Sequence, residues 1–241
     1  MKITQHGNNL WKLTRFFVVN YYLVREDDGL TLIDSGLSGG AGGILKAAAA
    51  IGQPITRITL THAHGDHAGS LDELRALLPE TVVAFSARTA AFLQGDLSLL
   101  PDEPQAQLRG SFINRQTQPT RVLQPDNYLG SLRVVAAPGH APDQIAFFDE
   151  RDGTLIAGDA FQTQGGIAVS GIMRWRFPLP AMATWHLPTA LETARALRRL
   201  NPARLVVGHG GVLDAPQAQM DQAIATAATE VEQSVQAMAY G

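Results

Sequence analysis

A segment dense in histidine follows directly after an apolar stretch, and it constrains this chain more than any other feature. The segment is Thr61-His62-Ala63-His64-Gly65-Asp66-His67. Imidazole nitrogen and carboxylate oxygen both suit Zn²⁺ and its first-row neighbours. Residues two apart in an extended segment point the same way, so His62, His64 and Asp66 are expected to converge on one side. His67 then turns toward a different point, and one loop could serve two metal ions.

Four further metal-capable residues each follow an apolar run and lie within two residues of a glycine. They are Asp34, His140, Asp159 and His209, after the runs 30–33, 132–137, 154–157 and 205–207. Strand ends followed by glycine-containing loops are where α/β proteins place their chemistry. This pattern favours a metal centre over a polar loop whose histidines are merely hydrogen-bonded. The chain has no cysteine, so every ligand must be nitrogen or oxygen.

Composition limits the remaining possibilities. A chain of 241 residues with 45% hydrophobic and 17% charged residues is typical of a globular protein, and we predict a single domain over 1–241. A net charge of −3 indicates neither a nucleic-acid nor a membrane partner. The start of the chain lacks a signal-peptide pattern and no apolar run reaches the length of a membrane span, so a cytoplasmic location is expected. A small-molecule substrate is the expected partner, and a homodimer stays open.

Strand-like and helix-like segments alternate along the chain, which predicts a layered α/β architecture. Expected strands are 10–14, 16–24, 30–34, 55–61, 80–85, 132–137, 144–148, 154–157 and 205–207, and expected helices are 44–50, 86–94, 189–200 and 215–237. A further helix should begin at the capping box Ser70-Leu71-Asp72-Glu73. Two irregular stretches, 95–126 and 163–188, are expected to be insertions that shape a substrate site.

The order of these motifs resembles that of the metallo-β-lactamase-fold hydrolases. The resemblance rests on His62-x-His64-x-Asp66-His67, Ala137-Pro138-Gly139-His140, Ala157-Gly158-Asp159 and Gly208-His209-Gly210, preceded by Thr31-Leu32-Ile33-Asp34-Ser35-Gly36. It covers nearly the whole chain. It implies a four-layer αββα sandwich with the site at one edge of two packed sheets.

The resemblance also implies a set of metal ligands. His62, His64 and His140 would hold a first divalent ion, Asp66, His67 and His209 a second, and Asp159 would bridge the two, with Asp34 behind the ligands. Zn²⁺ is the first choice for both ions, and Mn²⁺ or Fe also suits these ligand types. A hydroxide shared by the two ions would attack a carbonyl or phosphoryl centre. Asp66 or a metal-bound water would then deliver a proton to the leaving group, so Asp66 and Asp159 are the expected catalytic residues.

This chain differs from three known branches of the family that it resembles, and these differences narrow the activities expected of it. True β-lactamases of this fold are normally exported and do not use a bridging aspartate. Glyoxalase-II-type thioesterases carry a C-terminal helical domain larger than the roughly 30 residues that follow His209 here. Quorum-signal lactonases typically place a tyrosine three residues after the bridging aspartate, where this chain has Gln162.

The leading hypothesis is a dinuclear metal hydrolase acting on a lactone, thioester or carboxylic ester. Alternatives are a phosphodiesterase, an iron-dependent enzyme resembling persulfide dioxygenases, and a non-catalytic scaffold. Candidate substrate contacts are Gln162, Arg174, Trp175, Arg176 and His186. A structural role competes for His186. Phe177 and Trp185 could add an apolar wall to the substrate site, and the alternative is that they simply pack the insertion onto the domain.

Overall fold

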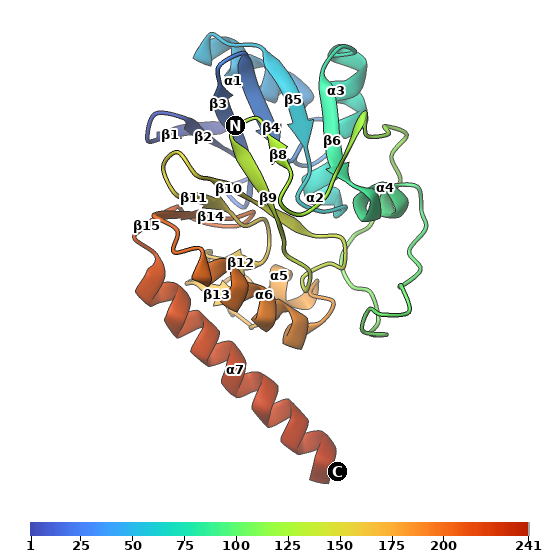
Figure 1. Cartoon of the computed structure of the whole chain (residues 1–241), viewed down its shortest axis with the longest axis vertical. Coiled ribbons are helices and arrows are strands. Elements are labelled where there is room, and N and C mark those ends of the chain that lie inside the picture. The colour runs from blue at the N-terminus through green and yellow to red at the C-terminus, as the bar shows by residue number, and fades with distance from the viewer. Residues whose placement is uncertain (241) are drawn as a thin grey trace. The chain divides into compact units, whose positions relative to one another are not determined.

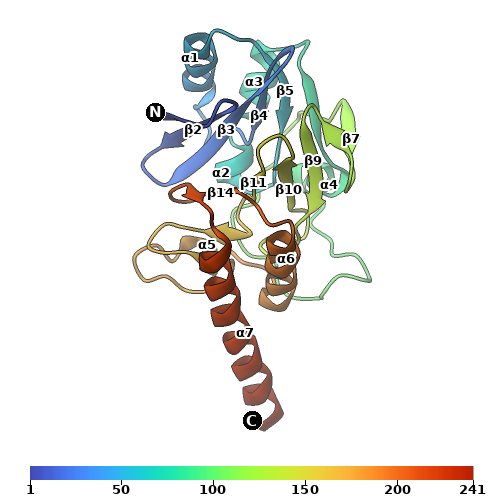
Figure 2. The same cartoon turned by 60° about the vertical axis from the view of Figure 1, so that its left-hand side comes forward.

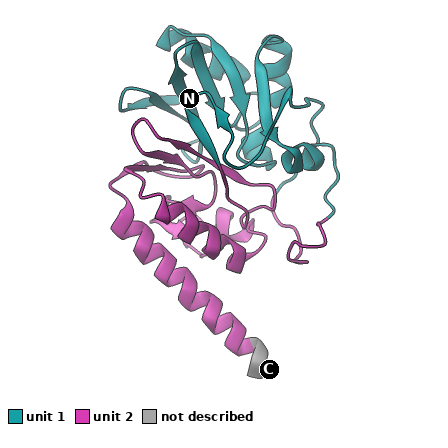
Figure 3. Cartoon of the chain, viewed as in Figure 1, with its two compact units in different colours: residues 1–98, 111–134 teal, residues 99–110, 135–241 magenta. Residues whose placement is uncertain are grey.

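A computed structural model describes residues 1–240, of which 238–240 are described by their backbone alone. The described chain divides into two compact units (Figure 3). Unit 1 holds Met1–Ser98 and Ser111–Val134, and unit 2 holds Leu99–Gly110 and the chain from Val135 onward. The expected single domain stays a prediction.

Unit 1 is built on a seven-stranded sheet in the order β1-β2-β3-β4-β5-β6-β7. Figure 1 labels β1 to β6 of this sheet, and Figure 2 labels β7. The strands are β1 (Lys2–His6), β2 (Leu10–Arg15), β3 (Val19–Glu26), β4 (Gly29–Ile33), β5 (Ile55–Thr59), β6 (Val82–Ser86) and β7 (Arg121–Leu123). Strands β1 to β4 pair antiparallel through tight turns, whereas β4 to β7 pair parallel. Parallel neighbours need long crossover connections, and helices occupy most of them.

The helices of unit 1 are α1 (Ala41–Ile51), α2 (Gly65–Ala68), α3 (Leu71–Leu77) and α4 (Ala87–Leu93). Helices α1 and α3, which contact each other, bury one apolar face each, with Ile44 and Leu74 fully covered. The short strand β8 (Tyr128–Leu129) pairs with β9 (Leu132–Ala136), in which the chain passes into unit 2. The parallel strands β4 and β5 end at the same edge of the sheet, which brings the residues that follow them together.

In unit 2, as in unit 1, two neighbouring parallel strands end at the same edge of a sheet. Strand β10 (Ile145–Asp149) pairs with β11 (Thr154–Ile156), which runs parallel to β14 (Arg204–Val206), and β15 (Leu213–Asp214) closes the edge. A separate pair joins β12 (Phe161–Gln162) and β13 (Ala168–Val169). The helices are α5 (Leu179–Met182), α6 (Leu187–Arg199) and α7 (Gln217–Tyr240).

Helices α6 and α7 run side by side (Figure 2). They share an apolar core with β13. Leu197 of α6 and Met220 and Ala227 of α7 are fully buried in that core. Beyond this contact α7 continues as an exposed helix toward the C-terminus (Figure 1). Among the described residues, no helix combines the length and the apolar character needed to cross a membrane.

The predicted elements are largely present, with two instructive differences. The strand expected from residue 16 begins only at Val19, because Phe16 and Phe17 adopt φ of 53° and 64° in the turn after β2. The capping box at Ser70 does not form. The Ser70 hydroxyl instead donates to the Leu37 carbonyl and accepts from the Gly40 N–H, because the glycine-rich segment before α1 also needs partners.

Gly139, which directly precedes His140, supports a prediction about folding stability. Its φ is 136°, and a Cβ there would lie 2.4 Å from the Cα and the amide nitrogen of Ala190 in α6. We expect Gly139→Ala to lower the free energy of unfolding by about 2–4 kcal/mol, because backbone atoms cannot move aside cheaply. Denaturant titration of the variant measures this loss.

Gly42 provides the matched control for that substitution. It lies inside α1, and a Cβ there would meet nothing within 4 Å. Gly42→Ala should therefore raise the free energy of unfolding by about 0.5–1 kcal/mol, through the better helix propensity of alanine. Equal effects of the two substitutions would mean that the close approach of Gly139 to α6 is not needed for folding.

Candidate metal centre

The histidine-rich segment of unit 1 follows β5 and is held by the second half of the first irregular stretch. The Gly65 N–H donates to the Ser111 carbonyl at 2.7 Å, and the Phe112 ring packs edge-on against the His64 ring. Arg115 donates to the carbonyls of Ala68 and Gly69 at 3.1 and 2.8 Å, at the end of α2. Residues 111–115 therefore hold the loop at the beginning and at the end of α2.

The extended conformation expected for this segment ends at His64. Gly65–Ala68 forms the single helical turn α2, so Asp66 and His67 project from a helix rather than a strand. The expectation that Asp66 shares a side with His62 and His64 by strand alternation is therefore wrong in its reasoning. The turn forms because His64 starts it with extended backbone and its carbonyl accepts hydrogen bonds from the N–H groups of His67 and Ala68.

Asp34 organises two of the histidines. It follows β4 with a φ of 64°, a conformation that is uncommon outside glycine and that aspartate and asparagine adopt more readily than most residues. Its Oδ2 lies 2.8 Å from His67 Nδ1, and its Oδ1 accepts from the Thr61 N–H at 2.7 Å. An ionised carboxylate only accepts hydrogen bonds. The His67 ring therefore carries its proton on Nδ1, and Nε2 is the nitrogen that can bind a metal.

Thr61 links Asp34 to His62, so the tautomer of the His62 ring is set in the same way. Its hydroxyl lies 2.9 Å from Asp34 Oδ2 and 3.0 Å from His62 Nδ1. The single hydroxyl proton goes to the carboxylate, so the oxygen accepts from His62 Nδ1–H. His62 therefore also turns Nε2 outward as a lone pair. Hydrogen bonding of this kind fixes ring orientation and raises the basicity of a metal-binding imidazole.

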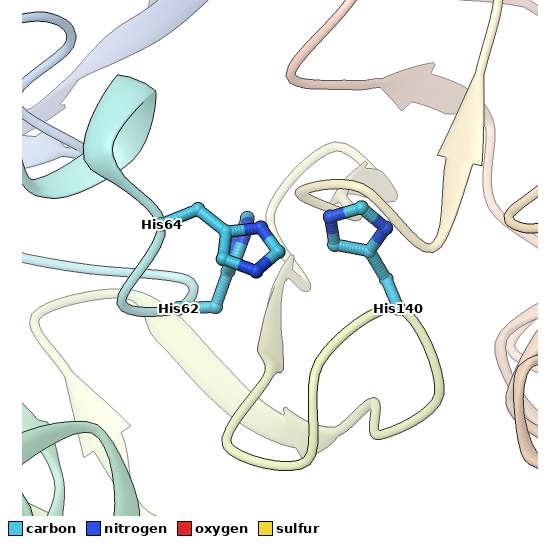
Figure 4. Close-up of side chains that lie close together, drawn as sticks. All are labelled: His62, His64 and His140. Carbon is cyan, nitrogen blue, oxygen red and sulfur yellow. The ribbon is translucent and has the colours of Figure 1, made fainter. Parts of the chain in front are cut away.

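In the unit 1 loop, nitrogen and oxygen atoms of neighbouring side chains lie about as far apart as two ligands of one metal ion. His62 Nε2 lies 3.1 Å from His64 Nδ1, and both side chains are buried (Figure 4). Two nitrogens bound to one tetrahedral ion at about 2.0 Å lie about 3.3 Å apart. His67 Nε2 lies 3.9 Å from Asp66 Oδ2, and the Asp66 side chain is 30% exposed. These four side chains form a cluster suited to divalent metal ions.

Unit 2 brings together the other three predicted ligands. Asp159 follows β11 and His209 follows β14, and these parallel strands end side by side, with the Gly208 N–H donating to the Gly158 carbonyl. Asp159 Oδ2 lies 3.1 Å from His209 Nε2 and 3.5 Å from His140 Nε2. His140 stands on the loop after β9 (Figure 4). All three side chains are buried.

The donor atoms of both clusters fit divalent cations. They are imidazole nitrogens and carboxylate oxygens, the ligands that Zn²⁺, Mn²⁺ and Fe accept. In unit 2 a carboxylate oxygen faces two imidazole nitrogens at ligand-to-ligand distances, and a cation between them would offset their mutual repulsion. Phe177 adds an apolar wall, because its ring centroid lies 5.3 Å from that of His209.

The candidate substrate contacts fall in different environments. Trp175 is 90% exposed and Arg176 is exposed, whereas Arg174 donates to the Ile167 carbonyl within the insertion. Gln162 is only 2% exposed, and its Oε1 has no hydrogen-bond partner among the described residues. Their substrate roles stay predictions. Trp185 is buried and donates to the Ala106 carbonyl, which agrees with the packing alternative.

His186 caps α6, as the structural alternative requires. Its Nδ1 accepts from the Thr189 N–H, and burial lowers the pKa of the ring. The unfolded chain therefore binds a proton more readily, so this contribution to stability is full above about pH 6.5 and declines as pH falls through the window below it. We expect His186→Asn, a good N-cap, to lose less stability than the parent between pH 8 and pH 5.5.

Thermal unfolding of both proteins at the two pH values measures this difference. Other histidines titrate in the same range, so the comparison is the change in melting temperature of the variant against that of the parent. Thr189→Ser, which keeps both the amide and a hydroxyl beside the ring, should follow the parent. An identical pH response of His186→Asn and the parent would contradict the prediction.

Several supporting residues were not predicted from the sequence. Thr61 could have been found, because it is the polar residue between the end of β5 and the first histidine. Arg115 contacts α2 from 46 and 47 positions away in sequence. Ser170 and Thr184 contact His140 from 30 and 44 positions away. No local pattern connects such distant side chains to the ligands.

Comparison with known proteins places this chain in a family. The family model of the metallo-beta-lactamase superfamily matches residues 14–209. The uncharacterized protein YobT of Bacillus subtilis is 48% identical over 93% of this chain and 97% of its own length. YflN of the same organism, a probable metallo-hydrolase, is 28% identical over 80% of this chain and 81% of its own. A hydroxyacylglutathione hydrolase of Francisella tularensis subsp. novicida is 32% identical over 45% of this chain and 34% of its own.

Solved structures agree on the fold. A metallo-beta-lactamase from Pontibacter korlensis matches with a TM-score of 0.70 at 18% identity, over 94% of this chain and 98% of the other. TTHA1623 in a di-iron-bound form matches with a TM-score of 0.63 at 25% identity, over 85% of this chain and 93% of the other. The predicted α/β fold and the predicted family are confirmed. The chain belongs to the metallo-β-lactamase superfamily of metallo-hydrolases.

Proposed function

We propose that this protein is a dinuclear metal hydrolase of small ester-like substrates, in which both clusters contribute ligands to one centre. The observation that carries the proposal is the position of Asp159, whose Oδ2 lies within 3.5 Å of both His140 Nε2 and His209 Nε2. In this assignment His140 serves one ion and His209 the other. A single carboxylate beside two imidazoles is the arrangement expected of a bridging ligand.

The remaining ligands follow the family order. His62 and His64 would join His140 at the first ion, and Asp66 and His67 would join His209 at the second. When bound, the two ions would lower the pKa of water and stabilise negative charge that develops on the substrate. Asp34 and Thr61 would act through the rings of His62 and His67, by keeping their Nε2 lone pairs available.

Asp66 is suited to move the proton in this reaction. Its side chain is 30% exposed, whereas the other predicted ligands are buried. In the proposed reaction the oxygen of water bonds to the acyl carbon and the bond to the leaving oxygen or sulfur breaks. Asp66 accepts the proton that water gives up and delivers it to the leaving group.

An acyl substrate is favoured over a phosphodiester by the relatives. The hydroxyacylglutathione hydrolase among them is an acyl hydrolase by name, and its similarity to this chain supports the ester-like class. The metal is assigned only as divalent. Zinc suits the ligand set, and iron is the metal bound in the similar structure of TTHA1623.

Metal analysis combined with a substrate panel tests the proposal. Protein purified without added metal is analysed for zinc, manganese and iron, and is then assayed on a lactone, a thioester, a carboxylic ester and a phosphodiester. We expect about two ions per chain and turnover of at least one acyl substrate. Turnover of the phosphodiester alone would assign the runner-up activity. One iron per chain with oxygen consumption and no hydrolysis would overturn the proposal in favour of oxidative chemistry.

A further inference from the structure

A chain of buried hydroxyl groups reaches His140 from the second irregular stretch of unit 2. Ser170 Oγ lies 2.9 Å from His140 Nδ1 and 2.8 Å from Thr184 Oγ1. Thr184 Oγ1 in turn donates to the Pro180 carbonyl at 2.7 Å. Ser170 and Thr184 are 1% and 6% exposed, so water does not compete for these groups. The chain therefore runs from a backbone carbonyl in α5 to the ring of a predicted metal ligand.

The donor and the acceptor in each of these hydrogen bonds follow from the Pro180 carbonyl, at which the series of hydroxyl groups ends. A carbonyl oxygen has no proton to give, so the Thr184 hydroxyl donates its only proton to Pro180. The Thr184 oxygen then has no proton left for Ser170, so in the contact between the two hydroxyls Ser170 donates and Thr184 Oγ1 accepts. Ser170 has no further proton, so its oxygen accepts from His140 Nδ1–H. A neutral His140 ring is thereby held with its Nε2 lone pair facing Asp159, 3.5 Å away.

We propose that Ser170 and Thr184 are positioning residues that orient His140 and set its tautomer for metal binding. The inference rests on the proposed function. It gives the 163–188 stretch a role in the metal centre beyond the substrate contacts expected of it. The assignment concerns His140 alone, and it requires neither residue to touch the substrate or a metal ion.

The backbone of the same segment supports His140 independently of the hydroxyl groups. The Trp185 N–H donates to the His140 carbonyl at 2.8 Å, and the His186 N–H donates to the Gly139 carbonyl at 3.0 Å. These bonds fix the backbone of the loop and do not involve the His140 ring. The hydroxyl pair is the part of this segment that contacts the ring itself, at Nδ1. Removal of a hydroxyl should therefore affect the ligand without releasing the loop.

The support of His140 differs in charge from that of the unit 1 histidines. His67 donates to a carboxylate and His62 reaches the same carboxylate through Thr61. His140 donates into a neutral chain that ends on a carbonyl. A carboxylate partner raises the basicity of a ligating imidazole more than a neutral one does. Orientation and tautomer, rather than added basicity, are therefore what Ser170 and Thr184 supply.

The test measures zinc affinity of the full chain by competition with a chelator. Ser170→Ala and Thr184→Val should each weaken zinc binding by about 10–100-fold, the usual cost of removing a partner of a ligating histidine. Thr184→Ser keeps the hydroxyl and should restore affinity to within about twofold of the parent. In the zinc-loaded protein the His140 Nδ1–H proton should be protected from exchange in the parent and in Thr184→Ser. It should exchange faster in Ser170→Ala, which keeps only the longer contact of Nδ1 with Thr184 Oγ1 at 3.3 Å.

Thr193→Val is the matched control. Thr193 is also a buried threonine of unit 2, and its hydroxyl donates to the Pro138 carbonyl without contacting a histidine. It should lose stability comparable to that lost by Thr184→Val and keep the zinc affinity of the parent. Zinc affinities of Ser170→Ala and Thr184→Val equal to that of Thr193→Val would overturn the inference. Both readouts are independent of hydrolysis, so failure of the ester substrates alone would refute only the proposed function.

Discussion

Asp159→Ala should lower turnover of the ester substrate by about a thousandfold, a loss of about 4 kcal/mol in transition-state stabilisation. The reason is geometric. Asp159 Oδ2 lies 3.1 Å from His209 Nε2 and 3.5 Å from His140 Nε2, so one substitution removes a ligand from both proposed ions at once. We also expect the metal content to fall from about two ions per chain to about one. Elemental analysis and steady-state kinetics on the same preparation measure both effects.

A separate aspartate controls for loss of charge. Asp214 lies in the same sheet of unit 2, its side chain is 71% exposed, and it pairs with Arg204 at 2.8 Å. Exposed ion pairs contribute little to stability, so Asp214→Ala should keep both metal content and turnover near parental values. Circular dichroism should be unchanged in both variants. An Asp159→Ala protein that held two ions and turned over at the parental rate would refute the two-metal assignment.

The ends of neighbouring parallel strands explain why much of the candidate site could be predicted. Asp34 and the histidine segment follow β4 and β5, and Asp159 and His209 follow β11 and β14. Apolar runs that end in a glycine and a metal-capable residue are visible in the sequence alone. Because parallel neighbours end at a common edge, those residues meet within each unit without any knowledge of their side-chain contacts.

The conformation of Asp66 shows where pattern reading fails. Strand alternation does not continue through Gly65, because the chain turns into α2 there. The turn depends on residues far away, since the Ser111 carbonyl takes the Gly65 N–H and Arg115 holds the carbonyls at the end of α2. Tertiary partners of this kind override local periodicity. The candidate ligands could therefore be named from the sequence, whereas the backbone geometry that presents two of them could not.

Ser70 and Ser170 illustrate a second limit. Ser70 satisfies the capping-box pattern but uses its hydroxyl on Leu37 and Gly40, which the fold places beside it. Ser170 satisfies no pattern and contacts a predicted ligand. A hydroxyl can serve many partners at similar cost, so sequence gives little indication of which one it takes. Residues that support the ligands emerge only when the direction of each hydrogen bond is followed.

Asp34→Asn should weaken metal binding by about 10–100-fold without unfolding the protein. Asparagine tolerates the φ of 64° at this position, so the backbone is not strained further. Its amide can offer only one oxygen where the carboxylate offers two. If that oxygen accepts from the Thr61 N–H, the NH₂ group faces His67 Nδ1 and drives the ring to the tautomer with its proton on Nε2. The same NH₂ donates to the Thr61 hydroxyl, whose own proton can then turn to His62 Nδ1.

One amide would thus block two ligating nitrogens, and a chelator competition assay with zinc measures the loss. Activity should recover in part as zinc is raised, because the ligands themselves remain in place. Asp28→Asn is the matched control, since the Asp28 carboxylate is exposed and pairs with Arg57 at 2.7 Å. Asp28 lies in the turn before β4, whereas Asp34 follows the other end of that strand. Its zinc affinity should equal that of the parent. If Asp34→Asn also bound zinc as tightly as the parent, the tautomers of His62 and His67 would not be set by Asp34, and the hydrogen bonds at 2.7–3.0 Å would serve folding alone.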